Sequence, residues 1–216
     1  MKGQTQSRVA AGFVVCGLIL VVTIWFPLFH VVSLKTATAE KAAVTFNAAD
    51  FAETFWTNQV VPAVPGTVKA DVLVAAIKAD PAAAKKKFGR SVGLSDGYFY
   101  FFSGSGQVVA ASDDEISLAL TPGNTNAEVV LEVGLVFGNA IRDGTGLLNA
   151  NDYPNSQDFN DLSSALNHIV ESRVLPGVKQ RAKVGARISF TGCAEVDDES
   201  SDLKPLKVVP LQAEVQ

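Results

Sequence analysis

The chain has 216 residues, of which 48% are hydrophobic, and its formal net charge is −4. This acidic balance argues against nucleic acid or anionic lipid as a general partner. With two histidines and two cysteines, the chain also lacks the ligands from which closed zinc centres are built. We therefore expect no metal and no cofactor.

The amino-terminal region contains a long uncharged apolar segment. Residues Val9 to Leu34 include no Asp, Glu, Lys or Arg across 26 positions. As a helix, the part before Pro27 would span about 27 Å, close to the roughly 30 Å hydrocarbon core of a bilayer. The sequence therefore predicts a membrane-spanning segment.

Flanking charges predict its orientation. Lys2 and Arg8 precede the apolar segment, and the first acidic residue is Glu40. By the positive-inside tendency, the amino terminus stays cytoplasmic and the rest of the chain lies outside. We expect a single-pass membrane protein with an exported carboxyl-terminal domain. The alternative is a signal peptide, cleaved after Ala39 at the end of a small-residue stretch.

One of the two cysteines, Cys16, lies within the predicted membrane segment, and the other, Cys193, lies in the exported part. Cys16 is preceded by Val14 and Val15, whereas bacterial lipoprotein processing requires a small residue directly before the cysteine. Its sequence context thus favours an apolar membrane residue over a lipid attachment site. Cys193, the only cysteine in the exported part, is expected to be buried in a strand rather than reactive.

Three helices are predicted between residues 40 and 92. Asn47 caps the first, Ala48 to Val61, which Pro62 is expected to end. The second covers Thr67 to Lys78. The third begins at Asp80-Pro81 and ends at Gly89, with Lys85 to Lys87 in its last turn.

Strand patterns dominate the remainder, residues 93–216, which has short aromatic and branched runs separated by turn residues. Gly104 to Gly106 lies between two such runs and is interpreted as a hairpin turn, not a phosphate-binding loop. A helix is expected within residues 157–175, followed by two closing strands with an acidic loop between them. The predicted strands are 98–102, 107–111, 116–120, 128–136, 185–191 and 206–215. These patterns predict an α+β protein with antiparallel strands.

Two segments resemble each other, Val60-Val61-Pro62-Ala63-Val64 and Val174-Leu175-Pro176-Gly177-Val178. Both follow a helical stretch. The similarity is explained either by an internal duplication or by two helices that end before a proline.

Several motifs, spread over nearly the whole chain, occur together. They are residues 25–29, 51–62, 78–84, 88–90, 140–143 and 151–153, with Gln157 and Asn167. In combination they resemble a known family, the uncharacterised predicted periplasmic lipoproteins called domain of unknown function 2291. The resemblance implies three parts: an anchor or signal segment (1–39), a helical subdomain (40–92) and a small OB-like β-barrel with the inserted helix (93–216). It also implies a single-pass protein of the bacterial inner membrane with a periplasmic carboxyl-terminal domain, and genes often placed beside sugar ABC transporter components, but no established activity.

Catalytic motifs are not persuasive. Gly93 to Gly97 fits the G-x-S-x-G pattern of a hydrolase nucleophile, but that motif needs a preceding strand and a following helix. The histidines, His30 and His168, are badly placed for a catalytic triad. The chain is therefore not expected to be an enzyme. Carboxylate-rich segments at Asp113 to Glu115 and Asp197 to Asp202 lack calcium-loop spacing and are interpreted as solvated hairpin loops.

A polar segment supplies the candidate binding residues. Arginine can bind carboxylate or phosphate, and Asn and Asp side chains pair with sugar hydroxyls. Trp56 is a candidate stacking platform for a sugar. The competing interpretations are a structural ion pair of Arg142, ordinary turn formation and a core position for Trp56. The candidate ligand or partner residues are Arg142, Asp143, Asn151, Asp152, Tyr153 and Trp56.

Two functions are compatible with these features. The first is a membrane-tethered accessory protein that works beside a sugar ABC transport system, held in the membrane by residues 9–34. The second is a periplasmic module that binds a small ligand or an oligosaccharide, since OB-like barrels commonly bind ligands on strand surfaces and adjoining loops.

Overall fold

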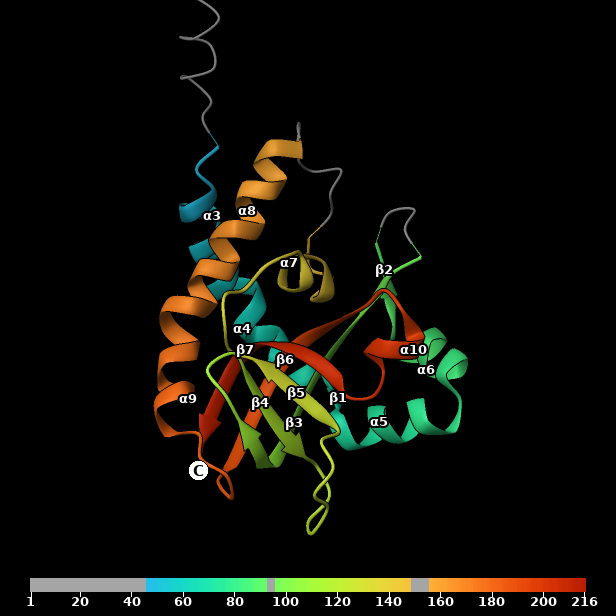
Figure 1. Cartoon of the computed structure of the whole chain (residues 1–216). Coiled ribbons are helices and arrows are strands. Elements are labelled where there is room, and N and C mark those ends of the chain that lie inside the picture. Colours follow the sequence, from blue (N-terminus) through green and yellow to red (C-terminus); the bar gives the residue numbers. More distant parts are fainter. Residues whose placement is uncertain (1–45, 93–95, 149–155) are drawn as a thin grey trace, which may run out of the picture. The chain divides into compact units, whose positions relative to one another are not determined.

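A computed structural model describes residues 46–92, 96–148 and 156–216. The predicted membrane segment and cleavage site lie outside these residues. So do Gly93 to Ser95 of the hydrolase-like pattern. Residues Asn47–Gln216 form one compact unit that mixes helices and strands, which confirms the predicted α+β class (Figure 1).

The helices before the sheet follow the predicted caps. Helix α3 begins after Asn47, whose side chain accepts hydrogen bonds from the backbone N–H groups of Ala49 and Asp50. Asp80 caps α6 in the same way through the N–H of Ala83. The elements are α3 (Ala48–Phe55), η1 (Trp56–Val60), α4 (Val61–Ala63), η2 (Val64–Gly66), β1 (Val68–Lys69), α5 (Ala70–Ala79), α6 (Pro81–Phe88) and β2 (Arg90–Ser91).

Proline 62 does not end the first helix, contrary to the prediction. The helix widens into a π-helical turn, η1, in which the N–H of Val61 donates to the carbonyl of Trp56 five residues earlier. Pro62 then occupies the first turn of α4, where its missing N–H is not needed. A wider turn thus accommodates the proline without breaking the helix.

The second proline segment has the same arrangement. The π-helical turn η4 (Val170–Val174) ends with the N–H of Leu175 donating to Val170, and Pro176 enters the first turn of α9 (Leu175–Arg181). The helix predicted to end near residue 175 therefore continues to Arg181. The two similar segments thus share a local geometry, a π turn followed by a proline in the first turn of the next helix.

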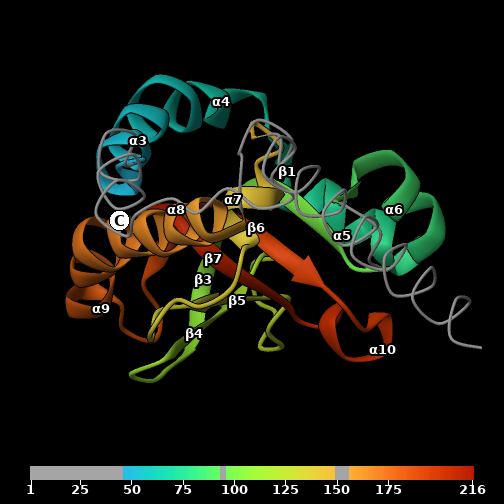
Figure 2. The same ribbon diagram turned by 90° about the horizontal axis from the view of Figure 1, so that it is seen from above.

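The second half of the unit contains the longer strands. Its elements are β3 (Tyr98–Ala111), β4 (Glu115–Ala119), β5 (Val129–Glu132), α7 (Ala140–Gly144), α8 (Ser156–Ile169), η4, α9, β6 (Arg187–Val196), α10 (Glu199–Asp202) and β7 (Leu206–Val215). Helix α7 and the short α10 were not predicted. Viewed from above, α8 crosses over the strands (Figure 2).

Strand β3 is continuous over fourteen residues, so the predicted hairpin turn at Gly104 to Gly106 is wrong. Its glycines serve close packing instead. A Cβ at Gly104 would lie 2.5 Å from the Cβ of Ala70, and one at Gly106 would lie 2.9 Å from the carbonyl oxygen of Ala119. The glycines thus allow α5 and β4 to approach β3.

The strand pairings form a closed circuit. Strand β3 pairs with β4, β4 with β5, β5 with β7, β7 with β6, and β6 with β3 again. The pairing of β5 with β7 is parallel, and so is that of β1 with β3, whereas only antiparallel pairs were predicted. Both departures join strands that are distant in sequence, which strand patterns alone do not specify.

The core lies between the strands and the helices that cover them. Helix α7 packs against β3, β6 and β7, while η4 and α9 pack against β7. The largest fully buried side chains are Tyr98, Tyr100, Phe55, Phe102, Leu73, Ile77, Ile116, Leu118, Leu131, Ile141, Leu162 and Leu166. Cys193 is fully buried in β6, as predicted, and burial raises the pKa of its thiol.

We expect Gly104→Ala to lower the free energy of unfolding by about 1–3 kcal/mol, because the new methyl group would overlap Ala70. Adding Ala70→Gly should restore part of the loss. Gly66→Ala is the control, since nothing lies within 4 Å of a Cβ there. Urea unfolding followed by circular dichroism measures all four proteins. Equal stability of Gly104→Ala and the parent would contradict the packing role.

Candidate functional site

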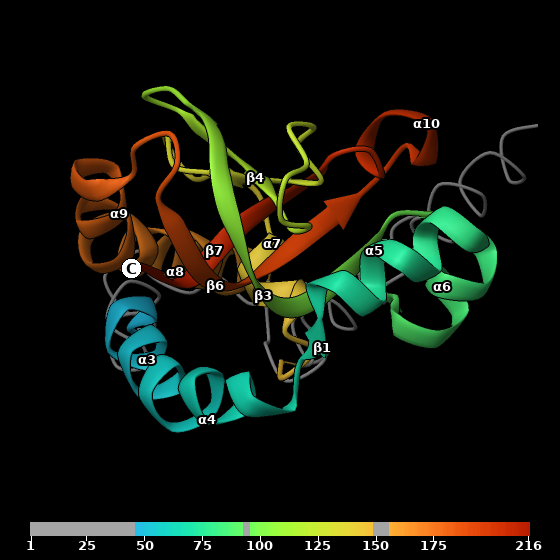
Figure 3. The same cartoon turned by 90° about the horizontal axis from the view of Figure 1, so that it is seen from below.

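A cleft of about 1070 Å³ lies alongside the carboxyl-terminal strands. Its lining comes from β3, β6 and β7, from the segment between η1 and the start of α5, and from η4 and α9. Figure 3 shows these elements from below, with α4 and β1 on one side and α9 on the other. Its volume is at the upper end of the range typical of small-molecule sites.

The sheet contributes small polar side chains to this cleft. Ser103 and Ser105 of β3 pair in register with Thr191 and Ser189 of β6. Thr191 in turn pairs with Gln212 of β7. Since alternate residues of a strand share a face, these hydroxyl and amide groups lie in rows across three strands. The surface is suited to hydrogen bonding with a ligand that carries several hydroxyl groups.

Trp56 lies at the edge of the same cleft. It is the first residue of the π-helical turn η1 and is 8% exposed, so most of the indole is packed in the core. Phe190 of β6 is a second aromatic residue in the lining. The side chain of Trp56 is therefore mainly a core residue, as one interpretation predicted, and it also borders a cleft, as a stacking platform would.

Four cationic side chains line the cleft. Arg187 donates from Nε and Nη2 to the hydroxyl oxygen of Ser105, at 3.1 and 2.9 Å. Lys69 donates to the hydroxyl oxygen of Ser103 at 3.2 Å. The other two are Arg173, which forms an ion pair with Glu53 outside the lining, and Arg181. Two carboxylates, Asp71 and Glu214, also line it.

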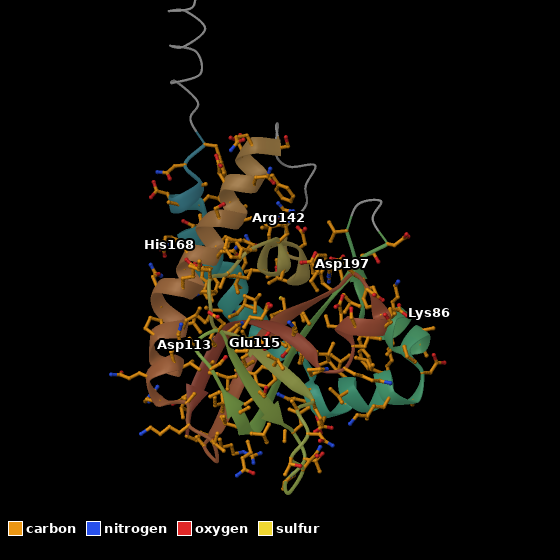
Figure 4. The ribbon with its side chains drawn as sticks, viewed as in Figure 1. Lys86, Asp113, Glu115, Arg142, His168 and Asp197 are labelled. Atoms are coloured by element: carbon orange, nitrogen blue, oxygen red, sulfur yellow. The ribbon has the colours of Figure 1, made fainter. Side chains whose placement is uncertain are left out.

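Arg142 and Asp143 lie elsewhere, on α7. The guanidinium donates from Nε and Nη2 to the two carboxylate oxygens of Asp143, at 2.7 and 2.8 Å. Both side chains are buried, 6% and 9% exposed. Arg142 also donates to the carbonyl of Phe159 at 3.3 Å and lies 3.7 Å from the centre of its ring. The ion pair is thus structural and lies within α7, while the contacts of Arg142 with Phe159 join α7 to α8; Figure 4 labels Arg142 on α7.

The remaining candidate residues, Asn151, Asp152 and Tyr153, lie outside the described part of the chain. Of the described candidates, only Trp56 borders the cleft, and the structure does not bring it together with Arg142 or Asp143. Their roles in ligand binding stay predictions.

The polar residues of the cleft were missed in the sequence. A signal for them was present, because Arg187, Ser189 and Thr191 alternate with apolar residues in a predicted strand. Ser103 and Ser105 show the same alternation. It was obscured by the interpretation of Gly104 to Gly106 as a turn, which cut β3 into two strands.

A second, smaller pocket of about 220 Å³ is acidic. Glu132, Glu195 and Asp197 line it, together with Lys207 and Phe137. Burial raises the pKa of Glu132, and Lys207 acts in the opposite direction. Burial also raises the pKa of Glu195, with nearby carboxylates such as Asp197 adding to the shift. Loss of a proton is thus disfavoured at Glu132 and Glu195, whereas backbone N–H donors lower the pKa of Asp202 in the same pocket.

The remaining features are His168, possible metal-binding groups and possible membrane-spanning helices. His168 lies on the exposed outer side of α8, 4.0 Å from Glu171 (Figure 4). Within the described residues, no group of three acidic, histidine or cysteine side chains is arranged to hold a metal ion. No helix among them is long and apolar enough to cross a bilayer.

Comparison with solved structures shows the fold class of the protein. The structure is similar to the crystal structure of an OB-fold protein from Thermotoga maritima, with a TM-score of 0.72 and 25% sequence identity. The match covers 80% of this chain and all of the other. The circuit of strands, with α8 between β5 and β6, thus belongs to a mixed α+β protein with an OB-fold structural relative.

The sequence identifies the family. Residues 19–214 match the model of the family described as "Predicted periplasmic lipoprotein (DUF2291)", so the chain belongs to it. This confirms the family resemblance. The description places the family in the periplasm and attaches no activity to it. No curated protein matches the sequence.

We expect Asp143→Asn to lower the free energy of unfolding by about 3–5 kcal/mol, because it leaves the buried Arg142 guanidinium without its counter-charge. The replacement Arg142→Met with Asp143→Leu should recover much of this loss. Asp161→Asn, at an exposed position of α8, is the matched control and should change the stability by less than about 0.5 kcal/mol. Chemical denaturation provides the measurement, and an unchanged midpoint for Asp143→Asn would contradict the structural role.

Proposed function

We propose that this protein is a non-catalytic periplasmic binding module whose cleft takes a small hydroxylated ligand, with a mono- or oligosaccharide as the first candidate. The carrying observation is the polar floor of the cleft, where hydroxyl and amide groups from three strands lie beside Trp56. Sugars are commonly bound by this combination, because hydroxyl groups need hydrogen-bond partners and the apolar ring faces pack on aromatic side chains.

The fold supports this proposal. Proteins with an OB-like barrel commonly bind ligands on strand surfaces and adjoining loops, and the strand circuit here would make such a barrel. The cleft is shaped by rigid elements, since strands form its floor and helical turns its walls. Such a framework holds donors and acceptors in place before a ligand arrives, which lowers the entropy cost of binding.

We also propose that residues 9–34 hold the module at the outer face of the inner membrane, as a single-pass anchor. Val14-Val15 before Cys16 does not suit lipoprotein processing. A protein anchor would serve the same purpose as the lipid in the family description. The second candidate function, an accessory role beside a sugar ABC transport system, follows from this location.

One surface favours that accessory role. Leu135 and Phe137, in the segment between β5 and α7, are 75% and 77% exposed. Phe137 borders the acidic pocket with Glu132 and Glu195. This exposed apolar segment therefore lies beside partly buried carboxylates. Such a surface suits a protein partner that presents apolar and basic side chains together. A subunit of the transporter is the partner that we propose.

We expect sugars to bind saturably to the full chain purified in detergent. Tryptophan fluorescence and thermal shift would be followed with glucose, galactose, ribose, xylotriose and maltotriose at up to millimolar concentration. Gln212→Ala should weaken the response of the best probe about tenfold, because it removes a hydrogen-bonding group from the cleft. Gln180→Ala, on the exposed side of α9, should leave it unchanged. A flat response to every sugar would reject the ligand class.

The partner surface has a separate test. Tagged full-length protein, cross-linked in native membranes, should retain a transporter component above the level of a scrambled-tag control. Replacing Leu135 and Phe137 by serine should lower the affinity about tenfold. Val184→Ser is the matched control, since Val184 is 70% exposed on another loop. Retention that survives the loss of both side chains would rule out this surface.

A further inference from the structure

We propose that the ligand of the cleft carries an anionic group, a carboxylate or a phosphate, which binds between Lys69 and Arg187. The inference rests on the proposed function and makes it specific: the preferred ligand is an acidic sugar rather than a neutral one. The observation behind it is the placement of these two cations on either side of β3, at the polar floor of the cleft.

Strand pairing sets the positions of both cations. Lys69 in β1 pairs in register with Ser103 of β3, and its ammonium group donates to the Ser103 hydroxyl. Arg187 in β6 donates to the hydroxyl of Ser105 from the other side of β3. The two serines are two residues apart on one face, so their backbones are separated by about 6.6 Å. A carboxylate or phosphate group fits over this short stretch of β3.

Both cations retain donors for a ligand. An ammonium group has three N–H donors, of which Lys69 directs one at Ser103. A guanidinium has five, and Arg187 uses two on Ser105. In the described part of the chain, neither is paired with a carboxylate, whereas Arg173 in the same cleft is paired with Glu53. Lys69 and Arg187 are therefore held by neutral hydroxyl groups that leave their charge uncompensated.

The carboxylates of the cleft restrict where an anion can bind. Glu214 lies on β7, on the far side of β6 from β3, and pairs in register with Ser189. It would repel an anion placed over β7. Asp71, in the first turn of α5 and two residues after Lys69, is the other carboxylate of the lining and would repel an anion placed toward α5. The favourable position is consequently over β3, between β1 and β6, and the hydroxyl groups of the ligand would extend toward Thr191 and Gln212.

The cleft differs in charge from the rest of the exported domain. Residues 40–216 have a net charge of −7, and carboxylates crowd the opposite pocket around Glu132 and Glu195. A small anion is repelled by most of the surface and attracted by the cleft. An extended polyanion would meet the acidic regions as well, so the arrangement selects for a small ligand with one charged group.

Calorimetric titration of the full chain in detergent tests the inference with glucose, glucuronate, glucose 6-phosphate and inorganic phosphate. We expect at least one acidic sugar to bind about tenfold or more tightly than glucose at low salt, and the difference to shrink at high salt. Lys69→Gln and Arg187→Gln should each weaken binding of the acidic sugar about tenfold more than they weaken binding of glucose, because only the acidic sugar loses a charge partner. Lys183→Gln, on an exposed loop outside the cleft, is the control.

The possible results separate the two proposals. If glucose and the acidic sugars bind equally, or if the acid preference survives both substitutions, the anion site is wrong while the sugar-binding function stands. If no sugar binds, neutral or acidic, the proposed function itself fails. If inorganic phosphate binds as tightly as glucose 6-phosphate, the sugar contributes nothing and the inference of an acidic sugar is overturned.

Discussion

The structure depends on the continuity of β3. This strand stays extended from Tyr98 to Ala111 and pairs with β1 and β2 near its start, with β6 along most of its length and with β4 near its end. Glycines at 104 and 106 make this continuity compatible with close packing on both neighbours. Because β3 joins the amino-terminal helices to the carboxyl-terminal strands, it also brings Lys69 and Arg187 to opposite edges of one short polar stretch.

The helical wall of the cleft depends on two π turns. Each lets a helical segment continue past a proline instead of ending before it. Through the first turn, Trp56 borders the cleft while the helix goes on to η2. Through the second, α9 continues past Pro176 and adds Arg181 to the opposite wall. Two local irregularities thus position both sides of the site.

Local chemistry was predictable from the sequence, and long-range pairing was not. The caps at Asn47 and Asp80 and the last strand, Leu206 to Val215, have signals within a few residues, and the structure places them where those signals indicate. The parallel pair β5–β7 joins residues 77 positions apart, such as Val129 and Leu206, and has no such signal. In the sequence, Gly104 is compatible with a turn or with close packing of another element against the strand. Only the position of Ala70 in the folded chain decides between these two interpretations.

The candidate site illustrates the same limit. Arg142 and Asp143 were noticeable because they are adjacent and polar, yet that adjacency lets each neutralise the other within a buried pair. Lys69 and Arg187 are separated by more than a hundred residues and looked ordinary, but strand pairing places both beside serine hydroxyls that do not neutralise them. A charge is available to a ligand when the fold gives it a neutral neighbour. For this reason the function of a cation follows from its partner in the folded chain more than from its neighbours in sequence.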